Sequence, residues 1–236
     1  MHQLLLVKQY LEERSKPESL QPTGLPFITI SRQAASGGHL LAHVLTTDFL
    51  KCGGDLFKGW HVFDKELCEL VALDPTLNTS IEQLLKERYR SEMTELFDSI
   101  FLGRSEQYMT LKKTFQIVRI LALVGKVIIV GRAGAFVTRG METGVHLRLV
   151  APERNRVRWM MRKLKLSHDE SATLIAKQDR ERRKMVGAFF DADIEDPLRY
   201  DLTVNAATMS THEISHALIE ILRARFDCDG TLKSKE

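Results

Sequence analysis

The residues best suited to chemistry first gather in a loop of small side chains, between a β-like run and a helix-like stretch. Residues 27–45 begin with an apolar run, pass through Ser36, Gly37 and Gly38, and continue from His39 with apolar residues at helical spacing. Backbone N–H groups at a helix N-terminus carry roughly half a positive charge and can hold an anion where small residues let it approach. The segment therefore predicts a phosphate-binding loop formed by Ser36, Gly37, Gly38 and His39.

This loop lacks two side chains of the standard phosphate-loop motif. The standard motif reads G-x-x-x-x-G-K-[ST], in which the lysine contacts the terminal phosphates and the hydroxyl contacts magnesium. Aligned on the glycine before the helix, this chain has Gly38 in place of the lysine and Leu40 in place of the hydroxyl residue. An ordinary tight connection between a strand and a helix has the same pattern, so the segment alone leaves both interpretations open.

Polar side chains also follow two further predicted strands, at the edge where open parallel sheets bind their ligands. Asp64 follows the second strand. Its carboxylate could accept hydrogen bonds from a ribose or a base, and it could also cap the helix that begins there. Arg132 follows Gly131 after the third strand. Its planar guanidinium suits a phosphate, and a solvent-facing arginine in a turn is the alternative.

A basic region follows the fourth predicted strand. Residues 153–184 contain eleven Lys or Arg against five Asp or Glu. Arg154 and Arg158 lie one turn apart on one predicted helix, and Arg180 and Arg183 lie one turn apart on the next. Two such helices joined by a short turn could close over a polyanionic substrate and stabilise charge on a transferring phosphoryl group. An ordinary solvated helical hairpin is the alternative.

Composition excludes several other classes of protein. The 236 residues, 44% of them hydrophobic, are enough for one domain with a full core. Three isolated cysteines and eight scattered histidines show neither disulfide nor metal-ligand spacing, so we predict no metal site formed by protein residues alone. A net charge of +3 is too small to indicate nucleic acid as a partner. The apolar runs are too short to cross a membrane, and we expect a cytoplasmic protein.

Short β-rich runs alternate with longer helical stretches, which predicts an α/β fold with a parallel sheet and helices on both faces. The five predicted strands are Phe27–Ile30, His61–Phe63, Val127–Val130, His146–Val150 and Leu202–Val204. We expect a single domain over residues 25–227, with a helical insertion at about 67–124. An N-terminal helix and linker at 1–24 and a flexible tail at 228–236 would flank it. Ser210 and Glu213 predict a capping box on the last helix.

Five segments in this order resemble the cytidylate kinase-like family, which belongs to the phosphate-loop (P-loop) nucleoside monophosphate kinases. They are ITISRQAASGGHLLAHVL at 28–45, VFDKELCELVA at 62–72, VIIVGRAGAFV at 127–137, HLRLVAPERNRVRWM at 146–160 and DPLRYDLTVN at 196–205. The resemblance spans about residues 27–222. It implies a three-layer P-loop NTPase-like fold with an arginine-rich lid at about 153–190.

The resemblance also implies an ATP- and Mg²⁺-dependent phosphotransferase whose acceptor is a small nucleotide, such as CMP. Asp64 and Arg132 would face the acceptor nucleotide. The lid would supply the arginines named above, Arg154, Arg158, Arg180 and Arg183. Nucleic acid and membrane are not expected partners, and the N-terminal helix is a natural place for a second copy of the chain to dock.

Three departures from the family pattern bear on activity. Ala35 replaces a glycine where the loop needs a positive φ, Gly38 replaces the lysine of true cytidylate kinases, and Ala133 replaces their aspartate. Arg32 or a lid arginine could supply the missing positive charge, because phosphoryl transfer needs electrostatic stabilisation more than one particular side chain. The alternative is a nucleotide-binding regulatory protein that has lost turnover.

Overall fold

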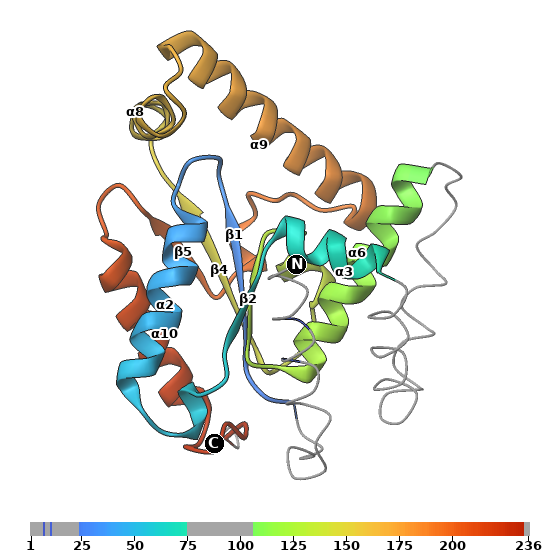
Figure 1. The fold of residues 1–236 in the computed structure, drawn as a ribbon, viewed down its shortest axis with the longest axis vertical. Helices are drawn as coiled ribbons and strands as arrows, with labels where there is room; N and C mark the ends of the chain where they lie inside the picture. The colour runs from blue at the N-terminus through green and yellow to red at the C-terminus, as the bar shows by residue number, and fades with distance from the viewer. Residues whose placement is uncertain (1–6, 8–9, 11–23, 75–105, 234–236) are drawn as a thin grey trace.

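The computed structural model describes residues 7, 10, 24–74 and 106–233, and its centre is a five-stranded parallel sheet (Figure 1). The strands are β1 (Phe27–Arg32), β2 (His61–Phe63), β3 (Val127–Val130), β4 (Gly144–Val150) and β5 (Leu202–Asn205). Their spatial order is β2-β3-β1-β4-β5, and every neighbouring pair is parallel. All five predicted strands are confirmed, with β1, β4 and β5 slightly longer than predicted.

Strand β3 is apolar on both faces because helices cover both sides of the sheet. All four residues of β3 are buried, as are the first four of β1. Strands buried on both faces read as continuous apolar runs. This is why Val127–Val130 could be predicted without an alternating pattern.

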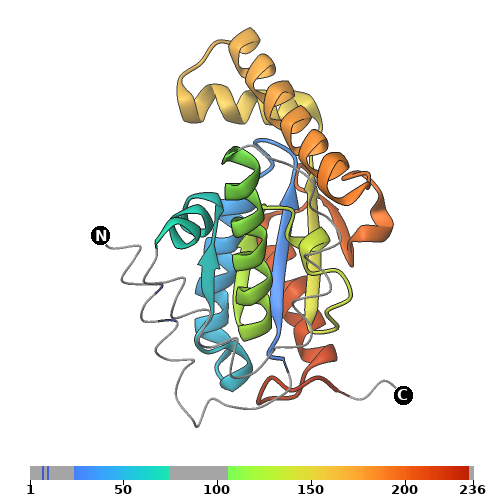
Figure 2. The ribbon, with the colours of Figure 1, turned by 90° about the vertical axis from the view of Figure 1, so that its right-hand side faces the viewer.

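Two helical layers enclose the sheet and form separate apolar cores (Figure 2). One face is covered by α2 (Gly38–Cys52) and α10 (Thr211–Arg225), with the short helix η2 (Asp55–Phe57) beside them. The other face is covered by α3 (Lys65–Leu73), α6 (Glu106–Val124) and α7 (Gly134–Val137). Alternate residues of β3 face the two cores, Ile128 toward α2 and Ile129 toward α6. The architecture is therefore the three-layer P-loop NTPase-like fold that was predicted.

A helical hairpin stands beyond the carboxyl ends of the strands, where Figure 1 shows it above the sheet. It consists of α8 (Glu153–Leu164) and α9 (His168–Phe190), and η3 (Pro197–Arg199) follows before β5. Ser167 and Glu170 form a capping box at the start of α9. Residues 168–170 therefore form the first turn of α9. The same device, Ser210 with Glu213, begins α10 as predicted.

The ends of the chain correct two expectations. Tyr10, expected to lie on a separate appendage, is fully buried, contacts Phe63 edge to face, and donates a hydrogen bond from its hydroxyl to the Gly125 carbonyl. Residues 228–233, expected to form a flexible tail, instead turn back on the domain. Phe226 pairs with Leu232 in a β-bridge, because the Phe226 side chain is buried in the core beneath α10.

The predicted helical insertion at 67–124 lies partly outside the described residues, which include only its two ends, α3 and most of α6. Those two helices pack against each other beside β2 and β3. Among the described residues, no helix is long and apolar enough to cross a membrane.

Candidate functional site

The predicted phosphate loop joins β1 to α2 at the carboxyl edge of the sheet. Gly37 is the N-cap of α2 in the left-handed region (φ 91°), and no side chain caps the first turn of this helix. The Ser36 hydroxyl points inward and donates to the Gln33 carbonyl at 2.9 Å, with the Leu149 carbonyl at 3.3 Å. The backbone donors at the start of α2 are therefore left for a ligand, whereas the Ser36 hydroxyl is already bonded within the protein.

Ala35 has φ 63°, which confirms the prediction that this position needs a left-handed backbone. A residue with a Cβ adopts this conformation only at a cost of about 1–2 kcal/mol. Ala133, the third-strand position where related kinases have aspartate, is also left-handed at φ 51°. The loops after β1 and β3 thus both hold strained alanines, which indicates that their surroundings fix them firmly.

Arg32, the last residue of β1, extends over the loop because two glycines leave room for it. A Cβ on Gly38 would lie 3.2 Å from Arg32 Cγ, so the Arg32 stem packs against the start of α2 where the standard lysine would begin. A Cβ on Gly131 would lie 1.9 Å from Arg32 Nη1, so the guanidinium occupies the space beside that glycine. Gly38 and Gly131 therefore admit a long cationic side chain between β1 and β3.

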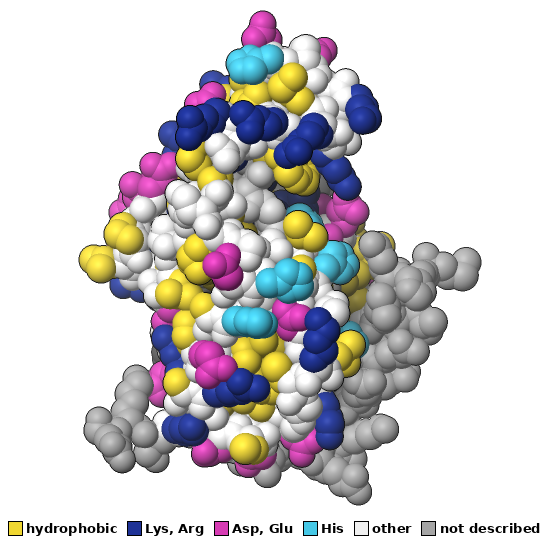
Figure 3. All heavy atoms as spheres, turned by 90° about the vertical axis from the view of Figure 1, so that its left-hand side faces the viewer, with side chains coloured by type: hydrophobic (Ala, Val, Ile, Leu, Met, Phe, Trp, Pro, Cys, Tyr) yellow, Lys and Arg dark blue, Asp and Glu magenta, His cyan; other side chains and the backbone are white. Residues whose placement is uncertain are grey.

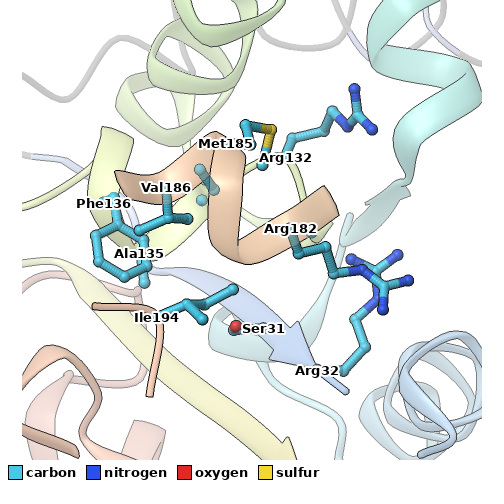
Figure 4. Close-up of a pocket in the computed structure, with 12 residues that line it drawn as sticks. Ser31, Arg32, Arg132, Ala135, Phe136, Arg182, Met185, Val186 and Ile194 are labelled. Carbon is cyan, nitrogen blue, oxygen red and sulfur yellow. The ribbon is translucent and has the colours of Figure 1, made fainter. Parts of the chain in front are cut away.

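A second guanidinium, that of Arg182 from α9, lies beside Arg32 (Figure 4). Burial, together with the charges of Arg182 and Arg132, lowers the pKa of Arg32 to about 9. Burial also lowers the pKa of Arg182. Arg32 stays protonated at neutral pH. Both guanidiniums are half-buried, and Arg182 Nη1 is paired with Asp179 Oδ1 at 2.9 Å. The excess positive charge that remains at this end of the site attracts an anion.

The two arginines close one end of a pocket between β1, β3 and α9. Its other wall is apolar and includes Ala135, Phe136, Val186 and Ile194 (Figure 4). The cavity has a volume of about 30 Å³, which is room for a single water-sized group, so in this conformation its lining can contact only a small part of a ligand.

Arg132 lines the same pocket but turns toward α3, where its Nη1 forms an ion pair with Glu69 Oε1 at 2.7 Å (Figure 4). Its Nε is buried and makes no hydrogen bond within the described residues. The predicted choice between a cleft arginine and a solvent-facing one is thus resolved: Arg132 is in the cleft, and part of its charge is balanced by Glu69.

Asp64 takes the capping role that the sequence had offered as one of two. Its side chain accepts a hydrogen bond from the Leu67 N–H at 3.0 Å, and its other oxygen lies 3.9 Å from His39 Nδ1 at the start of α2. Burial and the neighbouring Arg32 lower the pKa of His39, so this imidazole is neutral at pH 7. His39 and Asp64 therefore face each other across the mouth of the loop.

The structure does not bring the four predicted lid arginines to the pocket. Arg154, Arg158, Arg180 and Arg183 are all exposed. Figure 3 shows Lys and Arg side chains gathered on the outer surface of the hairpin. Their assignment as phosphate-contacting residues remains a prediction that this conformation does not support.

The arginines that do face inward lie one or two positions away. Arg156 is buried with Val157 and Met160 on the inner face of α8. Arg182 shares the inner face of α9 with Ile175, two turns before it, and with Val186, one turn after it. This apolar spacing was present in the sequence and could have fixed the phase of both helices.

Comparison with one protein of known structure supports this description of the fold. A protein of known structure from Eubacterium ventriosum superposes with a TM-score of 0.63 at 17% identity, over 85% of this chain and 99% of that one. A shikimate kinase from Bacteroides thetaiotaomicron gives a TM-score of 0.45 at 12% identity, over 84% of this chain and 99% of that one. A gluconokinase from Sinorhizobium meliloti gives 0.45 at 12% identity, over 86% of this chain and 94% of that one.

Two matches were found at the level of sequence. A uronate isomerase from Corynebacterium glutamicum is 28% identical over 99 residues. That segment spans 42% of this chain and only 19% of the isomerase. By contrast, one family matches nearly the whole described sheet together with the hairpin. Residues 27–208 match the cytidylate kinase-like family, and the chain belongs to this family.

Proposed function

We propose that this protein transfers a phosphoryl group from ATP to a nucleoside monophosphate, of which CMP is the most plausible. The observation that carries the proposal is the pair of inward guanidiniums of Arg32 and Arg182 beside the uncapped start of α2. Within the described part of the chain, Arg32 makes no ion pair with a carboxylate. Its charge is available to an anionic ligand.

The residues present fit the phosphates of ATP. The backbone N–H groups at Gly38 and His39 are at the positive end of the α2 dipole, and Gly37 leaves them accessible. Arg32 lies where the standard lysine would act, since its stem packs on Gly38. Bound ATP supplies the transferable phosphoryl group, and Arg32 and Arg182 would stabilise the charge that spreads over this group during transfer.

The acceptor would bind on the β3 side of the pocket. Arg132 lies there with an unpartnered Nε and with its position fixed by Glu69. A guanidinium held in this way can bind the acceptor phosphate without losing much freedom on binding. The apolar wall around Phe136 and Val186 could then contact the rest of the acceptor.

Magnesium would be held mainly by the phosphates of ATP. Mg²⁺ keeps several waters and needs only one or two protein carboxylates when phosphates are present. No group of three or more metal-ligating side chains occurs among the residues that the structure describes. Asp64 is the carboxylate at the mouth of the loop, and Leu40 offers no ligand.

A regulatory nucleotide-binding protein is the second candidate function. The specific observation in its favour is that the position of the magnesium hydroxyl is Leu40, an exposed apolar residue. Loss of this ligand would impair turnover more than nucleotide binding.

A coupled assay with ATP and Mg²⁺ across a panel of nucleoside monophosphates tests the proposal, together with calorimetric binding of the same nucleotides. We expect turnover with at least one monophosphate, and loss of at least a hundredfold in Arg32→Gln and Arg182→Gln. Arg139→Gln, an exposed arginine outside the pocket, is the matched control. Tight binding without turnover would favour the regulatory candidate, and neither binding nor turnover would refute both.

A further inference from the structure

One largely buried ion pair joins the hairpin to the phosphate loop through the backbone of a single residue, Ala34. Asp179 on α9 accepts a hydrogen bond from the Ala34 N–H at 2.7 Å, and Arg156 on α8 donates to the Ala34 carbonyl at 3.4 Å. Asp179 Oδ2 and Arg156 Nη1 are themselves 2.6 Å apart. The pair therefore closes a ring around the backbone of Ala34, and we call this arrangement the Ala34 clamp.

The clamp lies in a small apolar cluster that excludes water. Ala34 is 1% exposed and packs with Val157, Met160 and Ile175 from the two helices of the hairpin. Charge-assisted hydrogen bonds in such surroundings are worth more than at the surface, because water does not compete for them. The base of the hairpin is thus fastened to the loop by both packing and charge.

The clamp also controls an arginine of the pocket. Asp179 Oδ1, which binds the Ala34 N–H, also accepts a hydrogen bond from Arg182 Nη1 at 2.9 Å. One carboxylate therefore orients the loop backbone and one of the two inward guanidiniums together. If α9 moved away from the loop, both would be released at the same time.

The residue after the clamp explains why such an anchor is needed. Ala35 is in the left-handed region at φ 63°, a conformation that persists only when its surroundings hold it. On the other side, Gln33 is fixed by its N–H to the Leu149 carbonyl and by the Ala151 N–H to its side-chain oxygen. The loop is thus restrained on the β4 side by Gln33 and on the hairpin side by the clamp.

We propose that Asp179 and Arg156 are positioning residues that hold the phosphate loop and Arg182 in the geometry that binds phosphates. The proposal deepens the proposed function, and it rests on that function only for the identity of the ligand. Neither residue needs to touch the substrate. The clamp would act through the conformation of residues 34–36 and through the direction of the Arg182 side chain.

Hydrogen exchange of the full chain tests the clamp without a ligand. In the wild type, we expect the Ala34 amide to exchange far more slowly than the amide of Gly140, which lies in an exposed loop. Asp179→Ala should accelerate exchange at Ala34 by about 10- to 100-fold, the effect of losing a hydrogen bond to a charged group. Glu181→Ala, an exposed carboxylate two residues further along α9, should leave the rate unchanged.

Binding of inorganic tripolyphosphate gives a second, opposed prediction. If Asp179 were only a negative charge near the site, its removal would tighten tripolyphosphate binding. The clamp predicts the reverse: Asp179→Ala weakens tripolyphosphate binding about tenfold or more. Disorder of the loop costs more affinity than the removal of one negative charge restores. Asp179→Asn keeps an oxygen for the Ala34 N–H and should restore both slow exchange and most of the affinity.

The two arms separate failure of the clamp from failure of the proposed function. Exchange at Ala34 as fast as at Gly140 in the wild type, or tighter tripolyphosphate binding in Asp179→Ala, overturns the clamp. Slow exchange that depends on Asp179 supports it even if the wild type binds no nucleotide, in which case only the proposed function fails. If Asp179→Ala does not fold, Arg156→Ala is the second variant: it should also accelerate exchange at Ala34, and an unchanged rate would overturn the clamp.

Discussion

Gly131→Ala would move one guanidinium without removing any charge, and it therefore tests whether the position of Arg32 matters for binding. The new Cβ would lie 1.9 Å from Arg32 Nη1 and 2.8 Å from its Cζ. Both atoms belong to the far end of a flexible side chain, so the arginine should swing away while the backbone stays in place. Arg32 would then keep its charge but leave the position beside Arg182.

The magnitude has two parts. Gly131 has φ 84°, so an alanine there is strained by about 1–2 kcal/mol. Part of this loss of stability is offset because alanine lowers the conformational entropy of the unfolded chain. For a chain of this length, the net loss corresponds to a fall in Tm of roughly 2–4 °C. Displacing the guanidinium removes a hydrogen bond to a charged ligand, worth about 1.5–3 kcal/mol, and should weaken ATP binding by about 10- to 150-fold.

Gly140→Ala is a matched control because it isolates the backbone strain. Gly140 has φ 85°, and nothing lies within 4 Å of the Cβ that would be added. Both variants should therefore lose similar stability in thermal unfolding, while only Gly131→Ala should lose ATP affinity in calorimetry. Equal ATP affinities in the two variants would show that Arg32 does not bind phosphate from this position, and the reasoning from the two glycines would be wrong.

Two further predictions concern the charge and the backbone of the same region. The pKa of Arg32 is about 9, so the free protein loses this proton as the pH rises through that value. Because an anion binds the protonated form better, ATP affinity should be steady near pH 7–8 and fall above pH 9. Calorimetry across pH 7–10 checks this, and a wild-type profile parallel to that of Arg32→Gln would contradict it. Ala35→Gly should raise the free energy of unfolding by up to about 1 kcal/mol, because glycine relieves the strain at φ 63° and loses part of this gain in the unfolded chain. Chemical denaturation measures this free energy. Ala192 does not have a positive φ, so the control variant Ala192→Gly should destabilise the protein. Destabilisation by Ala35→Gly would mean that Ala35 is not strained.

The elements that depend on local pattern could be predicted from the sequence. The apolar run Val127–Val130 gave its strand directly, because both faces of this strand are buried. Ser210 and Glu213 gave the start of α10, because a capping box is a contact between residues three apart. The positive φ of Ala35 was expected only from the family resemblance, because the family has a glycine at this position.

The inward arginines of the hairpin, Arg156 and Arg182, were missed for a different reason. The one-turn spacing of basic residues and the family resemblance selected Arg154, Arg158, Arg180 and Arg183, all of which are exposed. The direction of a helical side chain depends on which neighbours are buried, and Val157 and Val186 would have set that phase. A basic stripe by itself marks solvent exposure more often than a binding site.

Pairings between distant segments had no sequence signal at all. The contact between Arg132 and Glu69 exists because β2 and β3 are neighbours in the sheet, which brings the start of α3 beside the end of β3. The contact of Asp179 with Ala34 joins residues 145 apart in the chain. Such pairs follow from strand order and hairpin placement, which periodicity alone does not determine.

The strand order also has a consequence for how the chain folds as it is made. β1 is the first strand to be synthesised, yet both of its neighbours come much later: Thr29 pairs with Ile129 of β3 and with His146 of β4. Closing loops of this length is slow, and folding rates fall as contacts become more distant in sequence. The apolar strand Phe27–Arg32 has two unpaired edges until β3 has left the ribosome and one unpaired edge until β4 follows, and unpaired edges are prone to aggregation. We therefore expect fragments that end before β4 to be insoluble, and the nascent chain to depend on chaperones during this interval.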